Sequence, residues 1–416
     1  MIPEKISIED YTYELPLHKI ALHPLPERDA SKLLVYKNGT VTESSFKQIH
    51  EFLNEKSLLV YNNTRVINAR LIFHKDSGKK IEIFCLEPMG ETTDYGKIMS
   101  TTTRLQWKCM VGGASAWKEG TLVKNIAHGN DFIRLEAKLI EKLPEAFLVE
   151  FSWSPAITFS EVLLLAGEVP LPPYIKRKPV GEDDERYQTI YSAEQGSVAA
   201  PTAGLHFTNE VFDRLDNKNI ERTALTLHVG AGTFKPVTAL TMDDHVMHAE
   251  WIDVDVATIE KIASSGNDIV AVGTTSLRTL ESLYWLGVKC LTEPNNESLS
   301  LRQWDAYTLK SSNINRKTAL LALLNWLQKK EIARLITTTQ LLILPGYIFK
   351  MSDAIITNFH QPRSTLLLLV AAAVGERWKD LYNHALNNEF RFLSYGDSNL
   401  LFINQGLIVT DVPTGM

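Results

Sequence analysis

A change of sequence pattern begins at the stretch LLVYNNTR, residues 58–65 of this 416-residue chain. Its first four residues are continuously apolar, as expected of a short strand that is covered on both faces. The two asparagines that follow indicate a turn. Upstream, the run LLVY at 33–36 stands before Asn38-Gly39, which predicts a strand that enters a hairpin.

Residues 66–156 contain several short strand-like runs and only weak helical periodicity. Turn signals separate the runs, for example Asp76-Ser77-Gly78 between two apolar segments. This pattern predicts a small β-barrel or sandwich. From residue 157 onward helices and strands alternate, beginning with a helix that Thr158 caps together with Glu161. Such alternation predicts a layered α/β domain.

The composition is that of an ordinary globular protein, with 44% hydrophobic and 22% charged residues. The net charge of −6 provides no general attraction to nucleic acid, so an RNA partner requires a local basic patch. Lys176, Arg177 and Lys178 form one basic cluster beside the acidic run 182–185. Contact with phosphate is the functional interpretation of this cluster, and a solvated loop is the alternative.

The three cysteines, Cys85, Cys109 and Cys290, lie far apart and show no CxxC or Cys/His spacing. Free thiols in a reducing compartment are therefore favoured over a disulfide framework or a zinc site. The start of the chain is polar and acidic, unlike a signal peptide, and the longest apolar run, 366–374, is too short to span a bilayer. We therefore expect a cytoplasmic protein.

The segment PTAGLHF at 201–207 places a histidine after small residues that let a ligand approach the backbone. Thr202, Gly204 and His206 are its candidate site residues, although a structural histidine is the alternative interpretation. The segment LHVGAGTF at 227–234 takes a strand into a glycine-rich turn. It lacks the third glycine and the following helix of a dinucleotide fold.

The candidates in this second segment are an imidazole, two glycines and a hydroxyl, namely His228, Gly230, Gly232 and Thr233.

The segment HVMHAE at 245–250 holds three ionisable groups within six residues. His245, His248 and Glu250 do not have the HExxH spacing of a zinc hydrolase. Hydrogen-bonding or acid–base roles for His248 and Glu250 are favoured over metal binding. We expect no metal, and a metal-dependent hydrolase remains an alternative.

Two further segments carry groups that can bind an anion. Arg65, after the Asn62-Asn63 turn, has a planar fork that fits a carboxylate or phosphate. The segment NFHQPRST at 358–365 carries His360, Arg363 and Ser364. Ser364 can cap the helix that follows, and the free amides of that helix can attract an anion that Arg363 reinforces. Surface capping alone is the alternative.

Together and in this order, these segments resemble one family, the S-adenosylmethionine:tRNA ribosyltransferase-isomerases of queuosine synthesis. Two of the unusual blocks are GEVPLPPYI at 167–175 and RFLSYGD at 391–397. The others lie at 13–16, 28–35, 62–70, 186–189, 199–207, 227–237, 245–250, 273–276, 345–347 and 357–368. The resemblance covers nearly the whole chain except 288–340.

The resemblance implies a fold and a domain organisation. It implies a discontinuous three-layer α/β/α sandwich, formed by residues 1–65 and 157–416, with a small β-barrel domain inserted at 66–156. The stretch 288–340 resembles an insertion of about forty residues into that pattern. The sequence departs from the usual family residues at Asn68, Gln361, Arg363, Ser398 and Asn399. These departures allow a divergent paralogue with another substrate.

The resemblance also implies a reaction. The ribosyl part of S-adenosylmethionine is transferred to 7-aminomethyl-7-deazaguanine at the wobble position of tRNA and is isomerised. The product is epoxyqueuosine-tRNA, and adenine and methionine are released. S-adenosylmethionine is thus a substrate that donates ribosyl, and the tRNA anticodon loop is the macromolecular partner. The chain is then both a transferase and an isomerase, and a monomer is favoured.

This chemistry needs groups that exchange protons near neutral pH and groups that hold the methionyl part. His228 and His206 are the leading acid–base candidates, with His248 and Glu250 behind them. Arg65 and Arg278 are candidates for the methionine carboxylate.

Asp397 is a candidate for the amino group of the methionyl part or for a ribose hydroxyl. The candidates for phosphate contacts are Lys176, Arg177 and Arg363. The remaining candidate substrate-binding residues are Thr202, Gly204, Gly230, Gly232, Thr233, His360 and Ser364.

Two alternatives to this reaction remain open besides the metal-dependent hydrolase. One is a paralogue that acts on another nucleoside or RNA. The other is a non-catalytic tRNA-binding protein, which would have no need for histidines at glycine-lined turns.

Overall fold

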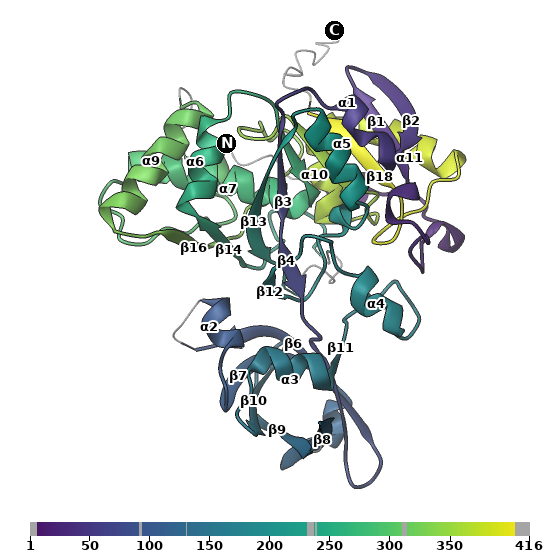
Figure 1. Cartoon of the computed structure of the whole chain (residues 1–416), viewed down its shortest axis with the longest axis vertical. Helices are drawn as coiled ribbons and strands as arrows, with labels where there is room; N and C mark the ends of the chain where they lie inside the picture. Colours follow the sequence, from purple (N-terminus) through teal and green to yellow (C-terminus); the bar gives the residue numbers. More distant parts are fainter. Residues whose placement is uncertain are drawn as a thin grey trace. The chain divides into compact units, whose positions relative to one another are not determined.

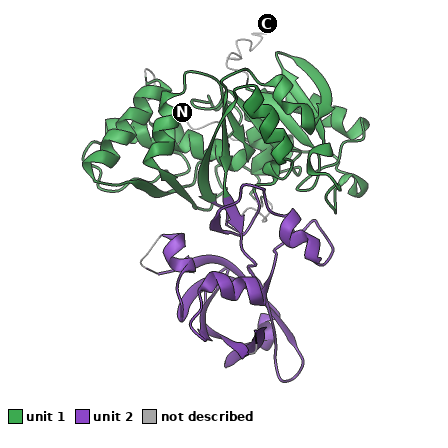
Figure 2. Cartoon of the chain, in the orientation of Figure 1, with its two compact units in different colours: residues 1–63, 201–227, 236–416 green, residues 64–200, 228–235 purple. Residues whose placement is uncertain are grey.

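The computed structural model describes residues 6–90, 94–129, 131–230, 237, 239–309 and 314–403. The chain divides into two compact units, which are green and purple in Figure 2. Unit 1 comprises Met1–Asn63, Pro201–Leu227 and Pro236–Met416. Unit 2 comprises Thr64–Ala200 and His228–Lys235, so it extends beyond the segment 66–156 at both ends.

A nine-stranded mixed sheet lies at the centre of unit 1 (Figure 1). Four neighbouring strands in its middle run parallel to one another: β13 (Glu221–His228), β3 (Leu58–Asn62), β15 (Ile269–Val272) and β17 (Ala354–Asn358). The apolar run that predicted a covered strand forms β3, and three of its residues are almost fully buried. Parallel strands end at the same edge of a sheet, so the residues that follow these four strands gather there.

The flanking strands complete the sheet. On one side lie β18 (Ser398–Phe402), antiparallel to β17, then β1 (Lys32–Lys37) and β2 (Thr40–Ser45). The hairpin predicted at Asn38-Gly39 is confirmed, because β1 and β2 pair on either side of these residues and both have positive φ. On the other side lie β14 (Glu250–Asp255) and β16 (Arg334–Thr339), which pair antiparallel.

Helices pack on this sheet. α7 (Gly273–Thr292) contacts β3, β15 and β17, and it also packs against α9 (Arg316–Lys329), which contacts α6 (Val256–Ser264). α10 (Thr365–Val374) contacts β18 and α11 (Arg377–Asn387). The remaining helices of unit 1 are α1 (Ile49–Phe52), α5 (Asn209–Asn217) and α8 (Asp305–Thr308).

The stretch 288–340 is built into unit 1. Its first residues form the end of α7, α9 packs on α7 and α6, and β16 pairs with β14 in the central sheet. Leu301 forms a further bridge to Thr339 of β16. This stretch therefore contributes to the core of the unit.

A seven-stranded antiparallel sheet forms most of unit 2. In order across the sheet its strands are β11 (Gly167–Glu168), β5 (Arg70–His74), β6 (Lys80–Met89), β7 (Arg104–Gly112), β10 (Phe147–Ser154), β9 (Asp131–Lys142) and β8 (Thr121–His128). A separate parallel pair joins β4 (Thr64–Val66) to β12 (Glu194–Ser197). The helices are α2 (Tyr95–Met99), α3 (Phe159–Ala166) and α4 (Gly181–Arg186).

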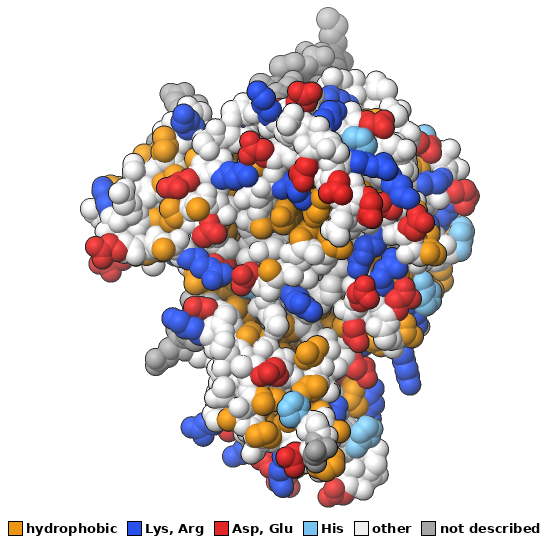
Figure 3. Space-filling view, viewed as in Figure 1, with side chains coloured by type: hydrophobic (Ala, Val, Ile, Leu, Met, Phe, Trp, Pro, Cys, Tyr) orange, Lys and Arg blue, Asp and Glu red, His pale blue; other side chains and the backbone are white. Residues whose placement is uncertain are grey.

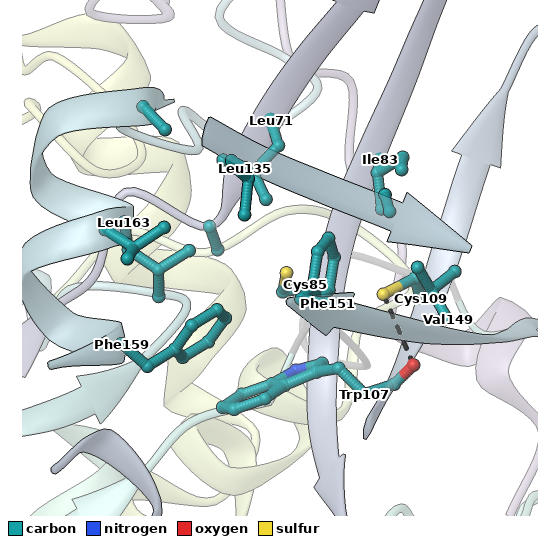
Figure 4. Close-up of a cluster of buried hydrophobic side chains, with 14 of the residues drawn as sticks. Leu71, Ile83, Cys85, Trp107, Cys109, Leu135, Val149, Phe151, Phe159 and Leu163 are labelled. Carbon is teal, nitrogen blue, oxygen red and sulfur yellow. Dashed lines mark hydrogen bonds between the residues drawn. The ribbon is translucent and has the colours of Figure 1, made fainter. Parts of the chain in front are cut away.

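The core of unit 2 lies between this sheet and α3 (Figure 4). Phe159 of α3 packs against Trp107, Phe151 and Trp153, with ring centroids 5.3, 5.8 and 5.3 Å away. The predicted cap of α3 is confirmed, because the Thr158 hydroxyl accepts from the Glu161 N–H and the Thr158 N–H donates to the Glu161 carboxylate. The antiparallel sheet, α3, and Ile98 and Met99 of α2 therefore bury a continuous apolar cluster.

The three cysteines are free thiols, with Cys85 and Cys109 buried and Cys290 partly exposed. Burial raises the pKa of the Cys290 thiol to about 12. Over the described ranges, each helix is too short or too polar to cross a membrane.

A buried carboxylate holds the loop that leads into β17. Glu281 of α7 is fully buried, and its oxygens accept from the backbone N–H groups of Lys350, Met351 and Ser352 at 2.9, 2.9 and 3.2 Å. They also accept from the Tyr347 hydroxyl at 2.8 Å. Burial raises the pKa of Glu281, and these four donors oppose that effect.

Replacing Glu281 by Ala should lower the free energy of unfolding by about 3–5 kcal/mol, because several buried donors lose their acceptor. Glu281→Gln, which keeps the volume and one acceptor oxygen, should lose less. Urea unfolding followed by circular dichroism measures both. A loss below about 1 kcal/mol for the alanine variant would show that this carboxylate does not hold the loop.

Candidate functional site

The edge where the parallel strands of unit 1 end collects polar residues from several segments. β17 ends at Asn358, α7 begins at Gly273 directly after β15, and β18 begins at Ser398 opposite Asn358. The turn η6 (Thr202–Gly204) contacts both β17 and α7. The segments 201–207 and 358–365, which the sequence singled out separately, therefore meet at this edge.

His206 is held in a hydrogen-bonded chain at this edge. The Thr202 hydroxyl donates to the Asn358 side-chain oxygen at 2.7 Å, and the Asn358 amide nitrogen lies 3.3 Å from His206 Nε2. With this amide orientation Asn358 donates, so Nε2 of His206 is the unprotonated nitrogen. The ring is 5% exposed and also hydrogen-bonds the backbone of Arg28.

Burial lowers the pKa of His206 to about 4, and the nearby Asp397 carboxylate only partly offsets this effect. The imidazole is therefore neutral at pH 7. It is present as the free base but binds a proton only weakly near pH 7, so the position that it gives to Asn358 is its better-supported role.

His360 is a second buried imidazole at the same edge. Its Nε2 lies 2.8 Å from the Thr357 hydroxyl, and burial lowers its pKa to about 4. Its backbone N–H donates to the Tyr382 hydroxyl at 3.0 Å. His360 is therefore neutral and fixed in place.

The two neighbouring candidates are engaged with the chain itself. The Ser364 hydroxyl accepts from the Leu367 N–H at 3.2 Å, so Ser364 caps α10, as both interpretations of this segment predicted. Arg363 pairs with Glu9 at 3.2 Å on the surface.

The Asp397 carboxylate is also engaged with the chain itself. It accepts from the backbone N–H groups of Lys32 and Arg391 at 3.0 and 2.8 Å, and from the Arg391 guanidinium at 3.1 Å. Only 2% of the residue is exposed. These hydrogen bonds hold the start of β1 against the loop before β18. The Asp397 carboxylate therefore serves the fold as a hydrogen-bond acceptor.

Arg278 and Glu250 form a buried ion pair between α7 and β14, with exposed fractions of 7% and 6%. The Nε of Arg278 also donates to the Leu341 carbonyl at 3.1 Å.

His248 is exposed, whereas His245 is partly buried and has a pKa lowered by burial and by His248. In the described ranges His245, His248 and Glu250 do not form a group that could hold a metal ion.

His228 lies in unit 2, at the end of β13, and is 5% exposed. Its Nδ1 is 3.0 Å from the Thr64 hydroxyl, and its ring stacks on Tyr95 with a centroid distance of 4.5 Å and an interplanar angle of 25°. Gly196 lies beside both rings. A Cβ at this position would be 2.6 Å from the Tyr95 ring and 2.8 Å from His228 Nδ1.

The sequence missed Tyr95, Gly196 and Asn358 as site residues. Asn358 stands two residues before His360 and could have been chosen with it. Tyr95 and Gly196 carry no local motif, because their role comes from contact with a histidine more than thirty residues away.

The predicted RNA contacts and Arg65 all lie in unit 2 apart from Arg363. Arg65 and Lys176 are exposed. Arg177 instead forms two hydrogen bonds with the buried carboxylate of Asp183, at 2.6 and 2.8 Å. On the face that Figure 3 shows, Lys and Arg side chains are interspersed with Asp and Glu.

Gly204 is buried in η6, and Gly230 is the last residue before a gap in the described ranges. Gly232 and Thr233 lie outside the described residues.

Replacing Gly196 by Ala should force the Tyr95 and His228 rings apart, because the added Cβ has contacts below 3 Å and φ is +149°. We expect the variant to lose about 2–3 kcal/mol of unfolding free energy. Gly120→Ala is the matched control, since Gly120 also has positive φ but has open space around it. Equal losses in the two variants, measured by urea unfolding, would argue against a clash at His228.

The low pKa of His206 predicts a pH dependence of stability. Its folded pKa of about 4 lies below the ordinary value of 6.5, so the unfolded chain binds more protons between these pH values. Stability should therefore fall as the pH decreases from 6.5 toward 4, by up to about 3 kcal/mol from this group. His206→Gln should reduce the slope of the pH profile of unfolding, with His360 supplying part of what remains, and His18→Gln, at an exposed histidine, should leave the profile unchanged. Identical profiles for the wild type and His206→Gln would contradict the assignment.

Comparison with known proteins gives consistent matches over nearly the whole chain. A family model described as "Queuosine biosynthesis protein" matches residues 8–401. The S-adenosylmethionine:tRNA ribosyltransferase-isomerase of Magnetococcus marinus is 37% identical over 399 residues, which cover 95% of this chain and 94% of the relative. The protein of the same name from Xanthomonas oryzae pv. oryzae is 37% identical, covering 94% of this chain and 96% of the relative. The crystal structure of S-adenosylmethionine tRNA ribosyltransferase from Thermotoga maritima is 27% identical, covers 94% of this chain and 99% of that chain, and has a TM-score of 0.44.

Proposed function

This chain belongs to the family of queuosine biosynthesis proteins, and we therefore propose that it is an S-adenosylmethionine:tRNA ribosyltransferase-isomerase. It transfers the ribosyl part of S-adenosylmethionine to 7-aminomethyl-7-deazaguanine at the wobble position of tRNA and isomerises it. Epoxyqueuosine-tRNA, adenine and methionine are the products. The observation that carries the proposal is the 37% identity to a ribosyltransferase-isomerase along 95% of this chain and 94% of the relative.

This reaction makes three chemical demands. A base removes a proton next to the sulfonium, an acid or hydrogen-bond donor assists the departure of adenine, and the attacking amine must be neutral. His228 is our leading acid–base candidate, because Thr64 and Tyr95 fix its ring in one orientation. His206 is the second candidate, and its low pKa keeps the ring neutral, which favours a positioning role over that of a proton donor. His248 and Glu250 stay behind them, since Glu250 is paired with Arg278.

The candidate residues for substrate binding remain proposals from the sequence. Arg65 and Arg278 are proposed for the methionine carboxylate, and Thr202, Gly204 and His360 for contacts with the substrate at the edge of the parallel strands. Gly230, Gly232 and Thr233 of the segment 227–234 are proposed for the same substrate. Ser364 and Asp397 contribute by fixing the backbone, since both hydroxyl and carboxylate are occupied by the chain. Lys176, Arg177 and Arg363 are proposed contacts of the tRNA phosphates.

We propose the matching domain organisation as well. Residues 1–65 and 157–416 form a three-layer α/β/α catalytic domain, and 66–156 form an inserted β-barrel. The mixed sheet with α7 and α9 stacked on it supports the first assignment, and contacts between β5 and β8 across the antiparallel sheet support the second. A tRNA substrate fits a monomeric cytoplasmic enzyme.

Three of the five departures from the usual family residues are explained by hydrogen bonds within the chain. Asn68 donates to the carbonyls of Leu164 and Gly167, and Ser398 and Asn399 lie within hydrogen-bonding distance of the Thr357 carbonyl. These side chains thus serve the fold. A paralogue with another RNA, or a non-catalytic tRNA-binding protein, has no comparable support.

The reaction can be tested with tRNA that carries 7-aminomethyl-7-deazaguanine at the wobble position. Incubation with S-adenosylmethionine should release adenine in proportion to the epoxyqueuosine that mass spectrometry detects in the digested tRNA. Binding of tRNA without release of adenine would overturn the proposal in favour of a non-catalytic protein. Release with another RNA but not with this tRNA would favour the paralogue.

His228→Ala should lower the single-turnover rate about 100-fold or more, which is the usual contribution of a positioned acid or base. His74→Ala is the matched control, because His74 is an exposed histidine of the same unit. An unchanged rate for the His228 variant removes this residue from the acid–base role.

A further inference from the structure

Arg278 carries a buried nitrogen that the fold leaves without a partner. Its Nε donates to the Leu341 carbonyl at 3.1 Å, and Nη1 donates to Glu250. Within the described residues its Nη2 has no hydrogen-bond partner, although the side chain is only 8% exposed. A buried guanidinium nitrogen with two unused N–H donors is costly, so it marks a place where an acceptor is expected.

The first turn of α7 begins about one helical turn before Arg278 and offers further donors. In the described residues the N-cap Val272 provides this 20-residue helix with no side-chain cap, so its first backbone N–H groups lie at the positive end of the helix dipole without that acceptor. Arg278 lies one turn after Thr274 on the same face, and side chains on a helix lean toward its N-terminus. The guanidinium therefore extends toward the free amides.

Two residues of this turn, Thr275 and Gly273, also favour the binding of an acceptor. The Thr275 hydroxyl is buried, and the described residues provide it with no hydrogen-bond partner. Gly273 begins the helix with φ +89°, and a Cβ there would lie 3.7 Å from Ala203 of the turn η6. The free donors thus lie beside the segment that carries Thr202 and His206.

The donors in this region suit a small oxyanion. Glu250 neutralises the single charge of the Arg278 guanidinium but occupies only Nη1, so the second nitrogen and the helix end still present donors to an incoming anion. A carboxylate is planar and matches the fork of a guanidinium. A phosphate could use the same donors.

We infer that Arg278 Nη2, the Thr275 hydroxyl and the first turn of α7 form the binding site for the α-carboxylate of the methionyl part of S-adenosylmethionine. This inference rests on the proposed function and gives it one substrate contact. Arg278 is then a binding residue whose second role, pairing with Glu250, keeps the guanidinium in place.

The test compares S-adenosylmethionine with its decarboxylated analogue, which lacks only the carboxylate. Binding of each to the full chain is measured by isothermal titration calorimetry. The wild type should bind S-adenosylmethionine about 10- to 100-fold more tightly than the analogue, the range expected for a charge-assisted hydrogen bond. Arg278→Lys keeps a charge beside Glu250 but removes the forked nitrogens, and it should lose most of this preference while binding the analogue as the wild type does.

Two further variants complete the test. Arg334→Lys is the matched control, because Arg334 pairs with Asp253 across β14 and β16, and it should keep the full preference. Thr275→Val, which removes only the hydroxyl, should lose part of the preference and serves if Arg278→Lys does not fold.

Each contrary result has a distinct meaning. Equal affinity of the wild type for the two ligands overturns the carboxylate site while the proposed function stands. A preference that persists in both Arg278→Lys and Thr275→Val places the carboxylate elsewhere. Weaker tRNA binding by Arg278→Lys, with an unchanged ligand preference, shows that the nitrogen contacts phosphate and overturns the assignment. Failure of the wild type to bind S-adenosylmethionine at all overturns the proposed function and this site together.

Discussion

The burial of α7 on almost every side is the constraint on which unit 1 depends. This helix contacts three strands of the central sheet and packs against α9, yet it carries Arg278, Glu281 and Ser282 among its buried residues. These buried polar side chains need hydrogen-bond partners, because a buried polar group without one is costly. The partners come from distant segments: Arg278 binds Glu250 and Leu341, Glu281 binds the loop before β17, and Ser282 lies 2.8 Å from the Thr339 hydroxyl. These contacts tie β14, β16 and β17 to one helix, and they explain why the stretch 288–340 is part of the core.

Burial has a second consequence, which concerns the histidines. His206 and His360 both lose water on folding, so both have pKa values of about 4 and are neutral at physiological pH. Neutral imidazoles with fixed hydrogen bonds can hold neighbouring groups or accept protons. His228 in unit 2 is fixed by different means, through the Thr64 hydroxyl and the Tyr95 ring, with Gly196 leaving the room that both rings need. The proposed reaction uses such groups near neutral pH. The orientation of these imidazoles is therefore more important for the reaction than their charge.

Local patterns predicted the features that depend on neighbouring residues. The apolar run at 58–61, the hairpin at Asn38-Gly39 and the cap at Thr158 are confirmed, because periodicity, turn chemistry and capping act over a few residues. The resemblance over nearly the whole chain predicted the family, and the family model that matches residues 8–401 confirms it. The candidate site residues stay predictions, and several of them are engaged with the chain itself. Ser364 caps a helix, Asp397 joins two segments and Arg177 binds Asp183.

The sequence by itself therefore determined the family, the short strands and caps, and the segments in which chemistry could lie. Only the tertiary structure decided which polar groups are already satisfied and which are left for a ligand. The physical reason is that hydrogen-bond partners of buried groups come from residues far apart in the chain, such as Asn358 for His206 and Tyr95 for His228. A local pattern carries no information on such pairs, whereas the folded chain leaves Arg278 Nη2 as a buried donor without a partner in the described residues.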